Sequence, residues 1–490
     1  MTKAYPRILP DKIAEMLLKK FKSEAAYLPF KQGGKIYNLY DLPKEFVIKG
    51  DLKLNYKRLT ELPDLSDVIV EGSFDCSRNN LSSLKGAPKK VGGDFICACN
   101  ELTSLEGTPQ EVSGDFWCFG NNLTSLTGGP QKVGGDFWCF GNLLTSLKDG
   151  PQKVGGDFDC HNNQLTSLED APKEVGGSFY CHNNQLTSLE GAPQKVSKDF
   201  SCSHNKLTTL EEGPQEIGEG FYCYCNELTS LKGAPQKVGG DFKCYENLLT
   251  SLEGAPNEVG GNFLCRENHL TSLKGAPQEV SRVFDCSKNQ LTSLVGGPQK
   301  IGGVFDCRCN QLTSLEGAPQ EVSGVFDCRC NQLISLEGAP QKVGADFVCS
   351  ENKLTTLEGA PQEVSGHFVC SKNQLTSLVG APQEVGGYFW CKHNDLNSLF
   401  KLPQMKEDSK IICDDALGQE YGFSDASNSG IKSGNLHKSP RYKNEVKIDE
   451  LRQKKHREDI EKRETATKNT QAAFEAWLKQ NSNCKNLPEK

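Results

Sequence analysis

The feature that most constrains this sequence is a period of 21 residues. Cysteines recur at this interval from Cys76 to Cys391, and prolines recur at the same interval from Pro88 to Pro403. One stretch, Val91–Gln110, reads VGGDFICACNELTSLEGTPQ, and its Phe, Cys, Asn and both Leu are kept in sixteen units. A unit this short cannot bury an apolar face alone, so the units must stack into one continuous core.

The order of residues within a unit predicts its path. Phe and Cys two positions apart point to the same side of an extended strand, so Phe-x-Cys predicts a short strand with a buried side. The Asn three residues after each Cys follows that strand, and its carboxamide can satisfy the backbone groups of the bend. We therefore expect a hydrogen-bonded ladder of Asn side chains, two inward Leu, and a return turn made by Pro and Gly.

This skeleton resembles the leucine-rich repeat family. The family consensus L-x-x-L-x-L-x-x-N-x-L maps onto Phe95, Cys97, Asn100 and Leu102, with Gly92 in place of the first Leu, and the likeness covers about residues 50–413. The short bacterial LPxLP class is nearest, through LTELPDL at Leu59–Leu65, although most units read LTSLxGAP and are one residue longer. The resemblance implies a horseshoe solenoid with a concave parallel β-sheet, a mostly helix-free convex side, and recognition through the concave face.

The repeat divides the chain into a solenoid and two flanks. Residues 51–413 form the solenoid, with degenerate capping repeats in which Leu52-x-Leu54 and Ile411-x-Cys413 replace Phe-x-Cys. Residues 1–50 are expected to be an N-terminal helical cap, in which Asp11 begins a short amphipathic helix carrying Ile13, Met16, Leu17 and Phe21 on one side.

The sequence after the solenoid changes composition twice. Residues 414–444 are rich in Gly, Ser, Asp and Asn and predict a flexible linker. Residues 445–490 predict a charged tail, helical or disordered, whose apolar stripe of Phe474, Trp477 and Leu478 either docks on the solenoid or a partner or stays solvated.

Bulk properties exclude several function classes. A net charge of −7 and a pI near 5.8 argue against nucleic acid as a partner. The sequence has no run of eighteen apolar residues, so we expect no membrane span, and its amino terminus lacks the apolar core of a signal peptide. Evenly spaced, free cysteines favour a reducing, cytoplasmic compartment; non-classical export as an effector stays open. We expect a monomer that needs no cofactor or metal.

Comparison of the units separates constant inward positions from variable outward ones. The outward positions lie between Phe and Cys and directly after Cys. Trp117, Phe119, Trp138 and Phe140 should form an exposed aromatic cluster, a feature typical of binding surfaces, although recent duplication of one unit would also produce it. Farther on, Asp and Arg alternate, which suits polar recognition or mutual neutralisation. The full candidate set adds Tyr180, Tyr222, Tyr224, Tyr245, Arg266, Asp306, Arg308, Asp327, Arg329 and Trp390.

We therefore predict a non-catalytic scaffold that binds a protein through its concave face. One alternative is a thiol-dependent enzyme, similar to the ubiquitin ligases of some bacterial leucine-rich repeat effectors, with Cys413 in a C-x-D motif as nucleophile; fewer than eighty residues follow it. A surface adhesin or passive rod is another. Cys309 and Cys330 leave a metal or redox role open.

Overall fold

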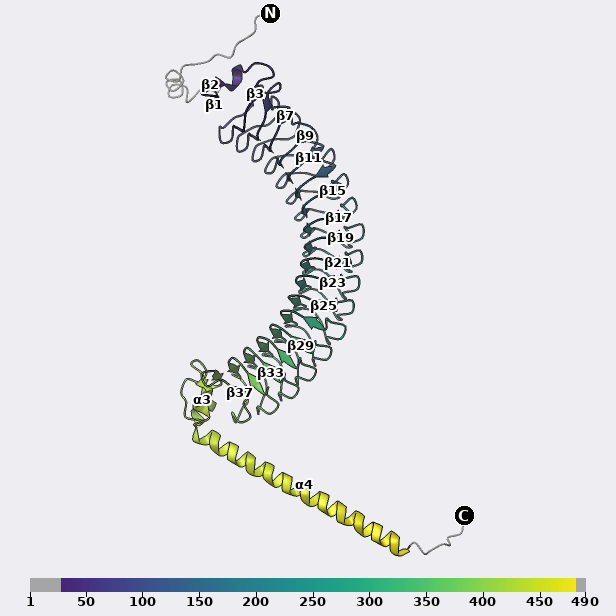
Figure 1. Cartoon of the computed structure of the whole chain (residues 1–490), viewed down its shortest axis with the longest axis vertical. Helices are drawn as coiled ribbons and strands as arrows, with labels where there is room; N and C mark the ends of the chain where they lie inside the picture. Colours follow the sequence, from purple (N-terminus) through teal and green to yellow (C-terminus); the bar gives the residue numbers. More distant parts are fainter. Residues whose placement is uncertain (1–27, 482–490) are drawn as a thin grey trace, which may run out of the picture.

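The computed structural model describes residues 28–481, and most of this length is a solenoid of stacked turns that bends into an open arc (Figure 1). Each complete turn contributes two short strands. The strands of one kind form a continuous parallel sheet, the first sheet. The strands of the other kind, which we call the second sheet, form a three-stranded and a fifteen-stranded parallel segment, because no pairing joins Lys90–Val91 to Glu111–Val112. The repeat solenoid with parallel sheets and few helices, expected from the 21-residue period, is confirmed.

The first sheet contains the Phe-x-Cys strands, in sequence order and strictly in register, as in the pairing of Phe116 with Phe137. Its strands are β4 (Leu52–Lys53), β6 (Phe74–Asp75), β8 (Phe95–Ile96), β10 (Phe116–Trp117), β12 (Phe137–Trp138), β14 (Phe158–Asp159), β16 (Phe179–Tyr180), β18 (Phe200–Ser201), β20 (Phe221–Tyr222), β22 (Phe242–Lys243), β24 (Phe263–Leu264), β26 (Phe284–Asp285), β28 (Phe305–Asp306), β30 (Phe326–Asp327), β32 (Phe347–Val348), β34 (Phe368–Val369), β36 (Phe389–Trp390) and β38 (Lys410–Ile412).

The second sheet forms where each turn returns, with a buried Val or Ile beside an exposed Lys or Glu in most of its strands. Its strands are β3 (Val47–Ile48), β5 (Ile69–Val70), β7 (Lys90–Val91), β9 (Glu111–Val112), β11 (Lys132–Val133), β13 (Lys153–Val154), β15 (Glu174–Val175), β17 (Lys195–Val196), β19 (Glu216–Ile217), β21 (Lys237–Val238), β23 (Glu258–Val259), β25 (Glu279–Val280), β27 (Lys300–Ile301), β29 (Glu321–Val322), β31 (Lys342–Val343), β33 (Glu363–Val364), β35 (Glu384–Val385) and β37 (Gln404–Met405).

The core is one continuous column of the residues that repeat. The Phe side chains stack on one another from turn to turn, as Phe116 does on Phe137 with ring centroids 5.3 Å apart. The sixteen ladder cysteines, Cys76 to Cys391, are fully buried, and so are nearly all of the repeated Leu residues. The prediction that Phe, Cys and both Leu face inward is confirmed.

The predicted Asn ladder is also present. Asn247 donates through Nδ2 to the carbonyls of Cys244 and Cys223, both at 3.1 Å, and accepts the Leu228 N–H at 3.0 Å through Oδ1. One side chain thus closes its own bend and links it to the preceding turn. The same pattern recurs along the array and joins the turns beneath the first sheet.

The described part of the N-terminal flank is a hairpin. Strands β1 (Pro29–Gln32) and β2 (Lys35–Asn38) pair antiparallel around Gly33 and Gly34, whose positive φ angles suit a two-residue hairpin turn. The 3-10 helix η1 (Leu39–Asp41) follows, and β3 then joins β5. The amphipathic helix predicted after Asp11 lies outside the described residues.

The flexible linker predicted at 414–444 is wrong, because this segment folds onto the end of the solenoid. Helix α2 (Asp415–Glu420) is followed by β39 (Ile431–Lys432), which pairs antiparallel with β38, and by helix α3 (Ser433–Leu436). We call residues 414–439 the C-terminal cap. It buries five apolar or aromatic side chains: Leu417, Tyr421, Ala426, Ile431 and Leu436. They follow no regular spacing in a segment that is otherwise polar, so the sequence pattern did not indicate a core.

Helix α4 (Pro440–Asn481) begins five residues before the predicted tail and extends away from the arc (Figure 1). Its first turns contact the solenoid: Arg441 donates to the Asn397 carbonyl at 2.8 Å, and Lys401 pairs with Asp449 at 2.8 Å. Residues 451–463 are exposed. The side chains of the predicted stripe at Phe474, Trp477 and Leu478 lie outside the described part.

Candidate interaction surface

The outward side of the first sheet, which we call the sheet face, carries two variable residues from each turn. Because the strands pair in register, the residue between Phe and Cys forms one column along the arc, and the residue after Cys forms a second column. The inward residues are constant while these columns change from turn to turn. The sheet face therefore brings the candidate residues into neighbouring positions without any change to the core.

Trp117, Phe119, Trp138 and Phe140 form the aromatic patch. Trp117 stacks on Trp138 with ring centroids 4.7 Å apart and planes at 5°, and Phe119 stacks on Phe140 at 4.5 Å and 6°. The predicted contiguous cluster is present, but its rings are half-buried rather than fully exposed. The reason is that each ring covers its neighbour's face, which leaves mainly ring edges toward solvent.

The second column continues this stack through two histidines that the sequence analysis did not select. The ring centroids of His161 and Phe140 are 4.6 Å apart, and those of His182 and His161 are 4.4 Å apart. The ring planes are nearly parallel in both pairs. Asp159 holds the Nδ1 of His161 at 2.6 Å. Burial and the neighbouring His161 lower the pKa of His182 to about 4, so His182 is neutral at pH 7 and extends the uncharged stack.

Two buried polar atoms on the sheet face have no hydrogen-bond partner: Trp117 Nε1 and His182 Nδ1. Most buried polar atoms in proteins are paired, and an unpaired one costs about 1–3 kcal/mol. Trp117 lies in the stack of the first column and His182 ends the stack of the second column. The patch therefore includes polar groups that an additional acceptor or donor would satisfy.

A serine pair interrupts the stack, and a tyrosine group follows it. Ser201 and Ser203 are buried, and Tyr222 leans toward them, with its hydroxyl donating to Asp199 at 3.2 Å. Tyr224 stacks on Tyr245 at 4.5 Å. On the other side of the serines, Tyr180 contacts His182 edge-on at 6.2 Å.

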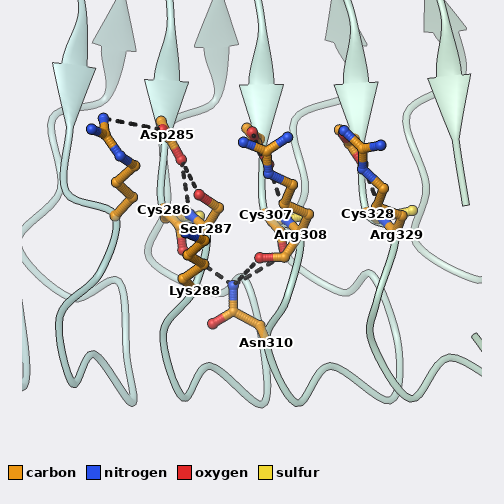
Figure 2. Close-up of polar contacts among 12 residues, drawn as sticks. Asp285, Cys286, Ser287, Lys288, Cys307, Arg308, Asn310, Cys328 and Arg329 are labelled. Atoms are coloured by element: carbon orange, nitrogen blue, oxygen red, sulfur yellow. Dashed lines mark hydrogen bonds and ion pairs between the residues drawn. The ribbon is translucent and has the colours of Figure 1, made fainter. Parts of the chain in front are cut away.

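The predicted Asp and Arg positions form a compact row (Figure 2). Its carboxylates, on Asp285, Asp306 and Asp327, are only 8%, 9% and 5% exposed. Arg308 pairs with Asp306 at 3.3 Å, and Arg329 pairs with Asp327 at 2.8 Å. Arg266 lies 3.9 Å above the Tyr245 ring and 3.9 Å from Asp285, so it connects the tyrosine group to the row.

Crowding of like charges perturbs this row. Burial, together with the neighbouring carboxylates of Asp285 and Asp327, raises the pKa of Asp306 to about 6 despite the opposing effect of Arg308. Burial also raises the pKa of Asp327. The arginines thus offset only part of the cost of three adjacent carboxylates, and a cationic group on a partner would lower that cost further.

Trp390 lies at the far end of the sheet face, 40% exposed, and pairs in register with Val369 and Ile412 rather than with another aromatic strand residue. The structure therefore does not bring it together with the aromatic patch.

A ladder of hydrogen bonds from Asp side chains also runs along this sheet and was not predicted from the sequence. Asp94, Asp115 and Asp136 each accept, through Oδ1, the backbone N–H of the equivalent residue in the next turn, at 2.8–2.9 Å. The signal was present as an Asp directly before many of the repeated Phe residues. These carboxylates therefore link neighbouring turns, as the ladder asparagines do.

The ladder cysteines and Cys413 are buried, and burial changes the acidity of their thiols. Desolvation raises the pKa of the ladder thiols well above its usual value, as at Cys97 and Cys139. Cys413, the alternative nucleophile, is also fully buried, and burial with Asp414 and Asp415 raises its pKa to about 12. This environment opposes the thiolate that nucleophilic catalysis requires.

Within residues 28–481, no helix is long and apolar enough to cross a membrane. In the same part of the chain, no group of three or more His, Cys, Asp or Glu side chains is arranged to hold a metal ion.

No protein-family model and no curated protein matches this sequence. Among solved structures, the chain is similar to YopM from Yersinia enterocolitica WA-314, at 19% identity over 74% of this chain and 91% of that chain, with a TM-score of 0.40. It is also similar to YopM from Yersinia pestis, described as a leucine-rich effector protein, at 20% identity over 74% and 88%, with a TM-score of 0.39. A third is InlJ from Listeria monocytogenes, whose functional domain includes a cysteine ladder, at 18% identity over 72% and 79%, with a TM-score of 0.36.

Proposed function

We propose that this chain is a non-catalytic, leucine-rich-repeat-type scaffold that recognises a protein partner through its sheet face, which we take to be the concave side of the arc. The observation that supports this proposal most is the division of each turn into constant inward residues and variable outward residues. The outward residues gather into the aromatic patch, the tyrosine group and the Asp–Arg row, although packing of the turns does not require those identities.

The chemistry of these groups indicates the kind of partner. In the aromatic patch the ring faces are occupied by stacking, so a partner meets ring edges, which carry partial positive charge and favour apolar groups and carbonyl oxygens. The Asp–Arg row offers paired charges at fixed spacing, which suits polar side chains of a protein. A long surface that combines both is suited to an extended protein epitope rather than to a small molecule.

The proposal extends to the setting of the protein. Free thiols in every described cysteine support a reducing compartment such as the cytoplasm, and we propose that the chain acts there as a monomer.

Affinity capture with the intact chain and with a Trp117→Ala, Trp138→Ala variant tests the binding role. The same column holds Asp159 and Ser201, so the fold accepts non-aromatic residues at this position. We expect the variant to lose at least 100-fold in affinity for the captured protein, in line with about 3 kcal/mol for two aromatic hot-spot residues.

A Val348→Ala, Val369→Ala variant is the matched control, because it truncates two apolar residues of the same column outside the patch. It should retain binding. Equal affinity of all three proteins would favour the passive rod. A Cys413→Ser variant that folded normally but lost a covalent adduct or an activity would favour the enzyme.

A further inference from the structure

Four turns carry a second cysteine two residues after the ladder cysteine: Cys99, Cys225, Cys309 and Cys330. This position has a left-handed backbone, with φ between 54° and 58° at the four cysteines. All four thiols are at least partly exposed, and Cys330 is the most exposed of them, in contrast to the buried ladder cysteines. The chain therefore displays a small set of thiols on the edge of the sheet face.

Side chains at this position touch across neighbouring turns. Lys288 pairs with Glu267 at 2.8 Å, Lys372 pairs with Glu351 at 2.7 Å, and the Cys225 thiol donates to Glu246 at 3.2 Å. Cys309 and Cys330 occupy this position in adjacent turns, and their thiols are close enough to perturb each other. Cys99 and Cys225 each have non-cysteine residues on both sides in this column, so among residues 28–481 only Cys309 and Cys330 are paired in this way.

We propose that Cys309 and Cys330 form a redox-active dithiol that low-molecular-weight disulfides oxidise to an intramolecular disulfide. The Cys330 thiolate attacks one sulfur of a disulfide such as oxidised glutathione, which forms a mixed disulfide and releases one glutathione thiolate. The Cys309 thiolate then attacks Sγ of Cys330 and releases the second glutathione thiolate. The two protons lost by the cysteines are taken up by these thiolates, and the two electrons reduce the glutathione disulfide to two thiols.

The order of the two steps follows from the environments of the thiols. Cys330 is the more accessible group and meets the oxidant first. Burial and the neighbouring Cys330 thiol raise the pKa of Cys309 to about 11, while Arg308 opposes this rise. Cys309 is thus the poorer nucleophile toward a disulfide in solution. Its position next to Cys330, however, gives it a high effective concentration for the attack on the mixed disulfide at Cys330. Arg308 and Arg329, which stand side by side in Figure 2, favour an anionic disulfide.

The backbone limits how stable the product is. The turns are held together here by hydrogen bonds from Cys309 N to Arg329 O and from Cys330 N to Ser350 O, both 3.0 Å. Neighbouring parallel strands lie about 4.8 Å apart, which suits the Cα atoms of a disulfide but exceeds the usual separation of its Cβ atoms. A disulfide at this position is therefore strained and readily reduced, which is typical of regulatory rather than structural disulfides.

The test treats the full-length chain with oxidised glutathione, blocks the remaining thiols, and maps peptides by mass spectrometry. All proteins carry Cys484→Ser, because Cys484 lies outside the described residues. We expect one crosslink between Cys309 and Cys330 that dithiothreitol reverses. Cys309→Asn should instead trap glutathione on Cys330, and Cys330→Asn should abolish the reaction; Asn162 and Asn183 show that this position accepts Asn.

Cys225→Asn is the matched control, because it removes an isolated thiol from the same column, and it should leave the crosslink unchanged. Circular dichroism checks that each variant folds. Stable glutathione on Cys330 of the otherwise unaltered chain, a disulfide between two chains, or absence of any reaction would each overturn the proposal.

Discussion

At the scale of single residues, the ladder asparagines contribute strongly to the stability of the solenoid. Each buried carboxamide satisfies backbone groups of two turns, so its removal leaves several polar groups without a partner. A buried unpaired group costs about 1–3 kcal/mol, whereas a satisfied hydrogen bond contributes about 1 kcal/mol. The loss should be local, because each turn contacts mainly its neighbours.

Asn247→Ala tests this view. The variant removes the acceptor of the Leu228 N–H and the donors to two cysteine carbonyls. We expect amide exchange at Leu228 to accelerate about 100-fold, which corresponds to about 3 kcal/mol of local opening. Glu246→Ala, at the exposed neighbouring position, should change it less than threefold. Equal effects of the two changes would contradict a special role of the ladder.

The carboxylate of Asp306 gives a second prediction at this scale. Its pKa is about 6 in the folded chain, above the ordinary value of 3.8 for an aspartate, so the folded state binds its proton more tightly than the unfolded state. Stability from this group is fully present below about pH 4 and is lost as the pH rises to about 6, by about 2–3 kcal/mol.

Asp306→Asn removes this charge. We expect the thermal midpoint of the variant to exceed that of the original chain at about pH 8 but not at about pH 3.5, where both side chains are neutral. The midpoints can be followed by circular dichroism at both pH values. A gain of the same size at both would show that repulsion among the carboxylates is not the cause.

At the scale of elements, one tyrosine of the C-terminal cap, Tyr421, links the cap to the last turn of the solenoid and to α4. The Tyr421 hydroxyl accepts the Leu399 N–H at 2.7 Å and donates to Glu445 at 2.8 Å, so it joins the last solenoid turn to α2 and α4. The open end of a stack exposes apolar side chains, and a cap is needed to cover them. The cap and the first turns of α4 therefore act as one unit.

Tyr421→Phe should loosen this unit selectively. We expect a loss of about 2 kcal/mol, seen as faster amide exchange at Leu399 and in the first turns of α4, with no change near the middle of the solenoid. Tyr388→Phe, at a residue that is 39% exposed, is the control and should leave exchange unaltered. Exchange that accelerated uniformly along the arc would contradict the nearest-neighbour picture.

At the scale of the whole molecule, the solenoid is a one-dimensional stack whose turns are interchangeable in their inward residues. Removal of the complete turn Gln341–Pro361 joins Pro340 to Gln362 in register and keeps every candidate binding residue. Stability in such a stack is approximately a sum over turns and their interfaces. The deletion should therefore shorten the arc without unfolding it.

We expect the variant without Gln341–Pro361 to retain its circular dichroism spectrum and a cooperative unfolding transition, with only a slightly lower midpoint. Deletion of residues 342–353, which removes both strands and the Asn of that turn but keeps its Leu residues, should disrupt the stack. If the complete-turn deletion unfolded as readily as the partial one, the turns would not be independent units.

Much of the fold could be predicted because the same residue types occupy the same inward positions in every repeated unit. The Phe, Cys, Asn and Leu positions predicted the strands of the first sheet, the buried core and the Asn ladder, and all of these are confirmed, whereas the second sheet was not predicted. The Asp94 ladder could have been found by the same comparison. The C-terminal cap could not, since Leu417, Tyr421 and Leu436 belong to no periodic pattern, and their burial depends on the particular surface that the last turn leaves open.

For the candidate site, the sequence by itself determined which residues face outward, because strand alternation and the repeat fix the side of each position. Only the tertiary structure decided what those residues do to one another. Stacking in register occupies the faces of Trp117 and Phe119 and leaves their edges exposed, and it places Asp306 between two other carboxylates. These effects arise from distances of a few ångströms between turns that are 21 residues apart in sequence, which residue identities alone do not specify.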